Sequence, residues 1–369
     1  RFTKAFFRDT QKLNIKKPAT VVKATDTIKD QIKIIEELIK KGYAYETDTA
    51  VYFDVSKFKN YGKLGGQSLE EKLVAVRDEV EEDKDKKHPA DFVLWFKLVG
   101  KYKNHTMQWD SPWGKGFPGW HIECSAISSS NLGQPFDIHV GGIDLIGTHH
   151  ENEIAQSEAA FGKPFVKVWM HGEFLNMDKD KMSKSAGTFI TMKDIKEKQI
   201  DPLAYRYLIL TAHYRTRLRF SWESLIAAQT AYNNLLSEIS RKREVKKSAN
   251  IRSYQKKFKY FISDDLDTPK ALALLWEIVK NPKLDNKSVG KLVKEFDEVL
   301  GLDLINKSKE LSKEQSDIPQ SISKLADERW ELRKNKDVDK ADKIRLTLAK
   351  KGYEVEDLED DFIVKKLVK

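Results

Sequence analysis

The sequence predicts an α/β region followed by an all-α region. Between residues 110 and 192, short apolar runs such as 136–140 and 165–170 flank one helical stretch, which is typical of an α/β layer. From residue 202 onward helix-forming residues dominate, so we expect a helical bundle with a small module at its C-terminal end. With 369 residues the chain is long enough for two or three domains.

Two helices and a β-hairpin are predicted in the N-terminal part. An aromatic-rich helix is expected over residues 2–13, and an amphipathic helix over 27–40, where isoleucines recur at helical spacing. Aromatic and β-branched runs at 43–45 and 51–55 flank a polar turn, which is typical of a hairpin.

A densely charged stretch, residues 69–90, is expected to be exposed and to precede a buried strand at 92–96. Further along, lysine-rich linkers separate helical patterns, and a division is expected around 306–322. The predicted helices of this part cover residues 205–211, 222–241, 269–279 and 324–351.

The net charge and the single cysteine narrow the possible partners and the cellular compartment. The net charge of +9 favours a polyanionic partner such as RNA, although a lysine-rich solvated surface is the alternative. The single cysteine, Cys124, excludes an intrachain disulfide, which is typical of a reducing compartment, so we expect the cytoplasm. No apolar run approaches the roughly 18 residues of a membrane span, and no membrane partner is expected.

Three residues are candidate metal ligands. Thr148 is predicted to cap a helix in a capping box with Glu151. His149 and Glu153, four residues apart, would then share one face of that helix. Together with Cys124 they supply donors that zinc prefers, while a fourth ligand is not accounted for. The alternative is a surface His–Glu pair and a small buried thiol.

Two further segments could hold a nucleotide. The apolar strand at 136–140 runs into Gly141 and Gly142, which allow close approach of a ligand, and Asp144 could accept hydrogen bonds from ribose. Lysines and hydroxyl groups at 181–185 could neutralise a polyphosphate. An ordinary turn and an exposed lysine-rich loop are the respective alternatives.

Residues 181–185 read Lys-Met-Ser-Lys-Ser, which matches the second signature of class I aminoacyl-tRNA synthetases. Other segments occur in the order found in cysteinyl-tRNA synthetases, and the chain resembles that family over its whole length. These segments are 111–114, 119–126, 137–139, 142–145, 149–156 and 169–171.

The resemblance implies a Rossmann-type catalytic domain, of which the second half is present, with a connective insertion. It divides the chain into four segments. These are 1–110, a helix and the connective insertion; 111–200, the second half of the catalytic domain with the zinc site and the signature loop; 201–310, a tRNA-binding helical bundle; and 311–369, an anticodon-recognition module.

By the same resemblance, residue roles can be assigned at matching positions. The implied zinc ligands are Cys124, His149 and Glu153. The implied amino-acid-binding residues are Trp120 and His121. The implied ATP-binding residues are His139, Gly142, Asp144 and Lys184, and Lys181 and Lys184 form the catalytic loop.

The activity that the resemblance implies is ligation of L-cysteine to tRNA(Cys). ATP with Mg²⁺ would activate cysteine to cysteinyl adenylate, and the 3′ end of the tRNA would then accept the cysteinyl group. Zinc would select the substrate thiolate, because it binds a soft sulfur donor better than the hydroxyl of serine. A monomer is expected.

Some positions depart from the family pattern. The first signature, of the His-Ile-Gly-His type, and the cysteine that supplies the fourth zinc ligand are not in the sequence, and we expect them in a longer reading frame. Val140, Gly147, Thr148 and Glu173 replace residues more usual in the family and could reshape the pocket floor.

Two other functions are compatible with parts of this pattern. One is a cysteine ligase that acts on an amino-sugar in low-molecular-weight thiol synthesis, against which residues 327–357 argue because they resemble an anticodon module. The other is a non-catalytic tRNA-binding paralogue.

Overall fold

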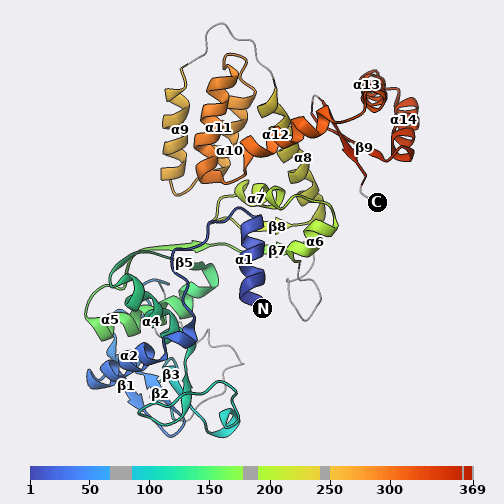
Figure 1. Ribbon diagram of the computed structural model, residues 1–369. Coiled ribbons are helices and arrows are strands. Elements are labelled where there is room, and N and C mark those ends of the chain that lie inside the picture. Colours follow the sequence, from blue (N-terminus) through green and yellow to red (C-terminus); the bar gives the residue numbers. More distant parts are fainter. Residues whose placement is uncertain (67–84, 178–189, 242–249, 360, 368–369) are drawn as a thin grey trace. The chain divides into compact units, whose positions relative to one another are not determined.

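The computed structural model describes residues 1–66, 85–177, 190–241, 250–359 and 361–367 (Figure 1). The chain divides into two compact units. The N-terminal unit is Pro18–Phe174, and the C-terminal unit joins Arg1–Lys17 to Leu175–Lys369. The four functional segments expected from the sequence stay a prediction.

In its described residues, the N-terminal unit combines an antiparallel sheet, a parallel strand pair and three helices. Its helices are α2 (Ile28–Lys40), α4 (Trp120–Leu132) and α5 (Glu151–Phe161). Its strands are β1 (Ala44–Glu46), β2 (Ala50–Phe53), β3 (Phe92–Lys97), β4 (Gly116–Pro118), β5 (Phe136–Gly142) and β6 (Val166–Gly172). Short helical turns are η1 (Ala24–Asp26), η2 (Val55–Lys57), η3 (Gly100–Tyr102), η4 (Ile143–Leu145) and η5 (Ile146–His150).

Strands β1 to β4 form the antiparallel sheet in sequence order, and β5 pairs with β6 in parallel. The predicted hairpin is confirmed, since Ala44 lies opposite Phe53 in the β1–β2 ladder. The predicted amphipathic helix is also confirmed as α2, which buries Ile28 and Ile35 in the core of this unit. Ile122 of α4 joins the same core, so the first turn of α4 is held rigidly.

The C-terminal unit is mainly helical, as the sequence predicts (Figure 1). Its helices are α1 (Phe2–Lys12), α6 (Met192–Glu197), α7 (Pro202–Leu210), α8 (Trp222–Ser240), α9 (Arg252–Ser263), α10 (Thr268–Val279), α11 (Asn286–Leu300), α12 (Leu304–Ser316), α13 (Gln320–Lys334) and α14 (Val338–Lys350). Its strands are β7 (Leu175–Met177), β8 (Leu218–Phe220), β9 (Tyr353–Asp357) and β10 (Phe362–Lys366). No helix among the described residues is long and apolar enough to cross a membrane.

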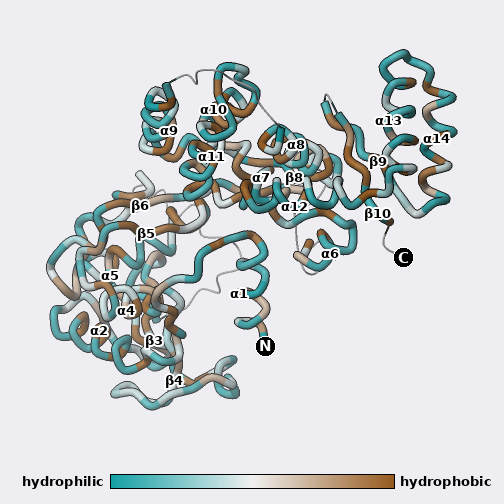
Figure 2. The backbone as a smooth tube through the Cα atoms, turned by 45° about the horizontal axis from the view of Figure 1, so that its top comes forward, coloured by the Kyte–Doolittle hydropathy of each residue, from teal (hydrophilic) through white to brown (hydrophobic). Residues whose placement is uncertain are grey.

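Two predictions for this unit are wrong in detail. The single helix expected over 324–351 is two helices, α13 and α14, because Lys336 adopts a left-handed conformation with φ of 61° and Asp337 caps α14. The boundary expected around 306–322, between the helical bundle and the C-terminal module, is also misplaced. Most of this range forms α12, which packs against α8. Figure 2 shows that α13 and α14 are hydrophilic over most of their length, and they cover a small core of their own.

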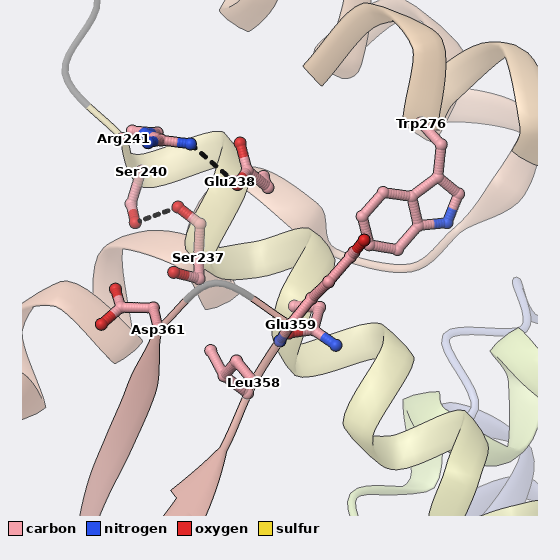
Figure 3. Close-up of a pocket in the computed structure, with 9 residues that line it drawn as sticks. Ser237, Glu238, Ser240, Arg241, Trp276, Leu358, Glu359 and Asp361 are labelled. Atoms are coloured by element: carbon pink, nitrogen blue, oxygen red, sulfur yellow. Dashed lines mark hydrogen bonds and ion pairs between the residues drawn. The ribbon is translucent and has the colours of Figure 1, made fainter. Parts of the chain in front are cut away.

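The module formed by α13, α14, β9 and β10 is fastened to the bundle by side chains. Asn233 of α8 donates to both carboxylate oxygens of Glu356, at 2.9 and 3.0 Å. A cavity of about 190 Å³ remains at this joint, between α8, Trp276 of α10 and the β9–β10 turn (Figure 3). Two charged groups in it are paired, Arg241 with Glu238 at 3.2 Å and Glu359 with Lys280 at 2.5 Å, and no predicted site residue lines it.

The start of α5 differs from the prediction. Instead of the Thr148–Glu151 capping box, one π-helical turn, η5, runs directly into α5, and no side chain caps the helix. The Glu151 carboxylate is buried and accepts hydrogen bonds from the backbone N–H groups of Gly62 at 3.0 Å and Gly65 at 2.8 Å. Tyr61 also donates to Asn152, at 2.5 Å. A turn that is distant in sequence, residues 61–65, thus holds the start of α5 in place.

We therefore predict that Glu151→Gln destabilises the protein by about 1–3 kcal/mol, because the amide places an NH₂ group against one of the two backbone N–H donors. Chemical denaturation followed by tryptophan fluorescence measures the effect, with the exposed Glu36→Gln as the matched control. Equal unfolding midpoints for the two variants would contradict this role of Glu151.

Candidate metal centre

The candidate site lies in the N-terminal unit, where α4 packs against α5. The first turns of α4 carry His121 and Cys124, the η5–α5 segment carries His149 and Glu153, and β5 contributes His139. Each side chain therefore comes from a regular element, which holds it in place better than a loop would.

The structure brings the three predicted metal ligands together. The donor atoms of Cys124, His149 and Glu153 all lie within 4.8 Å of one another. His149 and Glu153 are buried, and their four-residue spacing places them side by side. Small side-chain movements would bring these atoms to the bond lengths of a zinc ion, about 2.0–2.3 Å.

The carboxylate of Glu153 is fully buried between two histidines. Its Oε2 lies 2.7 Å from Nε2 of His139, with which it shares a hydrogen bond. Its Oε1 lies 2.9 Å from Nε2 of His149 but, among the described residues, accepts no aligned hydrogen bond. Burial pushes the pKa of Glu153 up, yet hydrogen bonding to His139 and the nearby His149 bring it below its usual value. Glu153 is thus an ionised carboxylate with one oxygen open to a cation.

The Cys124 thiol supports the same interpretation. Burial, with the negative charges of Glu153 and Glu123 nearby, raises the pKa of this thiol to about 12. The thiol therefore keeps its proton unless a cation stabilises the thiolate. Sulfur, imidazole nitrogen and carboxylate oxygen together fit zinc, whereas Ca²⁺ and Mg²⁺ prefer oxygen ligands alone.

His121 and Trp120 lie next to the cluster. Nδ1 of His121 is 2.9 Å from Nδ1 of His149, and burial together with His149 lowers the pKa of His121 to about 3, so this imidazole is neutral. The Trp120 ring is centred 4.2 Å from the His149 ring and is 62% exposed. Trp120 thus lies between the cluster and solvent, where a bound ligand would meet it.

A second set of aromatic side chains packs around His139. The Trp169 ring stacks on the His139 ring, with centroids 4.7 Å apart. The ring of His150, which is fully buried, is centred 4.8 Å from that of His139. Nδ1 of His150 is 2.8 Å from Nε2 of His171, and burial lowers the pKa of His150 to about 4. Sequence reasoning assigned no role to His150, His171 or Trp169, although adjacent histidines at the start of the helix were a usable signal.

The predicted nucleotide-binding residues lie beside this cluster. Gly142 ends β5, and a Cβ there would lie 2.3 Å from Oδ1 of Asp144, so the Asp144 side chain would have to move to admit a larger residue. Asp144 is exposed in η4. His139, predicted to bind ATP, contacts Glu153 instead in this structure, and its role stays a prediction. Lys181 and Lys184 lie outside the described residues.

Comparison with known proteins places these features in a family. A family described as tRNA synthetases class I (C) catalytic domain matches residues 1–230. The cysteine–tRNA ligase of Treponema denticola is 40% identical over 383 aligned residues, which cover 96% of this chain and 77% of that protein. Cysteine–tRNA ligase 1 of Burkholderia lata is 44% identical over 363 residues, covering 97% and 74%.

Among solved structures, methionyl-tRNA synthetase of Mycobacterium tuberculosis in complex with methionyl-adenylate is similar in fold. Its TM-score is 0.56 at 13% sequence identity, and the match covers 86% of this chain and 80% of that one. The fold class predicted from the sequence is thereby confirmed. The chain belongs to the cysteine–tRNA ligases, a family of class I aminoacyl-tRNA synthetases.

Proposed function

We propose that this protein ligates L-cysteine to tRNA(Cys) at the expense of ATP. The observation that carries the proposal is the cluster of Cys124, His149 and Glu153, the last two buried, in a chain of this family. The names of its relatives support the same activity. We place the protein in the cytoplasm as a monomer, in line with its family and its single cysteine.

Cys124, His149 and Glu153 would supply three ligands to one Zn²⁺. When bound, zinc stabilises the thiolate of the substrate over a serine hydroxyl, because it favours a soft sulfur donor. Glu153 contributes the open oxygen, and His139 fixes the orientation of its carboxylate through the 2.7 Å hydrogen bond. Neutral His121 steadies His149 from the other side.

The remaining predicted residues would bind the substrates. Trp120 and His121 would contact cysteine, while His139, Gly142 and Asp144 would hold adenosine. In the first step the cysteine carboxylate attacks the α-phosphate and pyrophosphate leaves; Lys181, Lys184 and Mg²⁺ would neutralise the phosphate charge. In the second step a ribose hydroxyl of the tRNA attacks the carbonyl carbon and AMP leaves. Positioning and electrostatics suffice for both steps.

The test is zinc content together with cysteine-dependent ATP–pyrophosphate exchange, measured on the full-length protein. We expect one zinc per chain and exchange with cysteine but not serine. Cys124→Ser should lose zinc and reduce exchange by more than about 100-fold, because three donors fall to two. Ser130→Ala, on the exposed face of the same helix, serves as the matched control and should behave as wild type.

The molecule that accepts the cysteinyl group distinguishes the proposed function from the alternative ones. Exchange without transfer to tRNA would favour the amino-sugar ligase. Absence of both zinc and exchange would sink the proposal and favour the non-catalytic tRNA-binding paralogue.

His139 offers a second test, because two roles have been assigned to it. If it orients Glu153, His139→Leu should weaken zinc affinity about 10–100-fold, and His139→Gln, which can still hydrogen-bond, should restore part of it. If it serves ATP alone, the KM for ATP should rise while zinc affinity stays unchanged. Competition with a zinc chelator and exchange kinetics measure the two quantities separately.

A further inference from the structure

A buried polar cluster joins the two helices that carry the candidate metal ligands. Gln156 of α5 is fully buried, as are Ser125 of α4 and Ser157 of α5. The side-chain NH₂ group of Gln156 donates to the backbone carbonyl oxygen of His121 at 2.6 Å and to Oγ of Ser125 at 2.7 Å. One amide of α5 thus bridges two points on α4.

The partners of this amide settle its orientation. A carbonyl oxygen can only accept a hydrogen bond, so the NH₂ group must face His121, and both of its N–H bonds are used. Oε1 of Gln156 is buried and has no hydrogen-bond partner among the described residues. A buried acceptor without a partner costs free energy, which an apolar side chain of the same length would avoid. Stability alone therefore does not account for the amide.

The bridge lies within one helical turn of the ligands on both helices. On α4, His121 precedes Cys124 by three residues and Ser125 follows it directly. On α5, Gln156 follows Glu153 by three residues, which places both side chains on the same side of the helix. Any slide of α4 along α5 would therefore break the bridge and change the distance between Cys124 and Glu153.

Apolar packing alone does not fix the position of one helix along the other. Helices α4 and α5 lie side by side (Figure 1) and contribute Ile122, Ala126 and Ala155 to the apolar core. Hydrophobic contact has no preferred direction, whereas a metal site must be held within about 0.5 Å of its working geometry. Hydrogen bonds to two defined acceptors supply the direction that apolar contacts lack.

We propose that Gln156 is a positioning residue for the metal centre. Its amide sets the distance between Cys124 and Glu153, and it holds the backbone of His121, which is proposed to contact cysteine. Gln156 acts through α4 and not on the metal itself. The inference rests on the proposed function, because that function supplies the Zn²⁺ that these ligands would hold.

Zinc affinity tests the proposal without catalysis. On the full-length protein, competition with a chelator should show that Gln156→Met binds zinc about tenfold more weakly than wild type, the loss typical of removing a contact that supports a metal ligand. Methionine keeps the length of the side chain but donates no hydrogen bond. With Co²⁺ in place of zinc, the visible absorption bands, which report ligand geometry, should shift in this variant.

A neighbouring variant separates positioning from stability. Ser157 donates to Oγ of Ser125 at 2.7 Å, so Ser157→Ala removes a hydrogen bond from the same cluster and leaves both bonds of Gln156 in place. It should change the unfolding midpoint but neither the zinc affinity nor the Co²⁺ spectrum. Should Gln156→Met fail to fold, Gln156→Asn decides, because its amide is one methylene too short to reach both acceptors. It should also weaken zinc binding.

Kinetics give an independent readout. Both Gln156 variants should raise the KM for cysteine, because the backbone of His121 is no longer held, and they should leave the KM for ATP unchanged. A merely destabilised protein would instead lose active enzyme and keep both KM values.

A zinc affinity and a Co²⁺ spectrum equal to those of wild type in both Gln156 variants would overturn the proposal and leave the amide as an ordinary hydrogen bond between helices. An equal loss of zinc affinity in Ser157→Ala would overturn it as well. Failure of the proposed function has a different signature, because wild type itself would then lack both zinc and exchange.

Discussion

The site depends on one buried charge, the carboxylate of Glu153. It is fully buried, and the histidines that flank it come from different elements, His139 from β5 and His149 from the turn before α5. Removing a partner of a buried charge costs about 3–5 kcal/mol, so β5 and α5 must keep their mutual register. Glu151, two residues earlier, anchors the start of α5 separately by accepting hydrogen bonds from the turn at Gly62 and Gly65. A cation among Glu153, His149 and Cys124 would complete the charge balance.

Local pattern predicted part of this arrangement. The four-residue spacing of His149 and Glu153 was sufficient to place them on one face, and the hydrophobic periodicity of α2 was sufficient to find that helix. Spacing alone could not bring Cys124 to them, because that requires α4 to pack on α5. The shared preference of the three side chains for zinc suggested the grouping, and the family resemblance implied it. The capping box failed because Glu151 found backbone donors more than 80 residues away in sequence. Similarly, the helix break at Lys336 could not be predicted, because neither glycine nor proline marks it in the sequence.

Strand β4 connects the antiparallel sheet to the candidate site. Its end enters α4 at the turn that carries Trp120 and His121, and its Phe117 stacks on Phe96 with ring centroids 4.8 Å apart. The residues proposed to bind cysteine therefore lie at the junction of the antiparallel sheet and α4. The neutral imidazole of His150, beside the cluster, adds no positive charge that would repel a cation.

The most direct test of the central claim is X-ray absorption at the zinc edge of the full-length protein, recorded with and without substrate. The account predicts that L-cysteine adds one sulfur neighbour at about 2.3 Å and that L-serine adds none. A metal environment that is the same with both amino acids, or that persists with its sulfur count unaltered in Cys124→Ser, would contradict it.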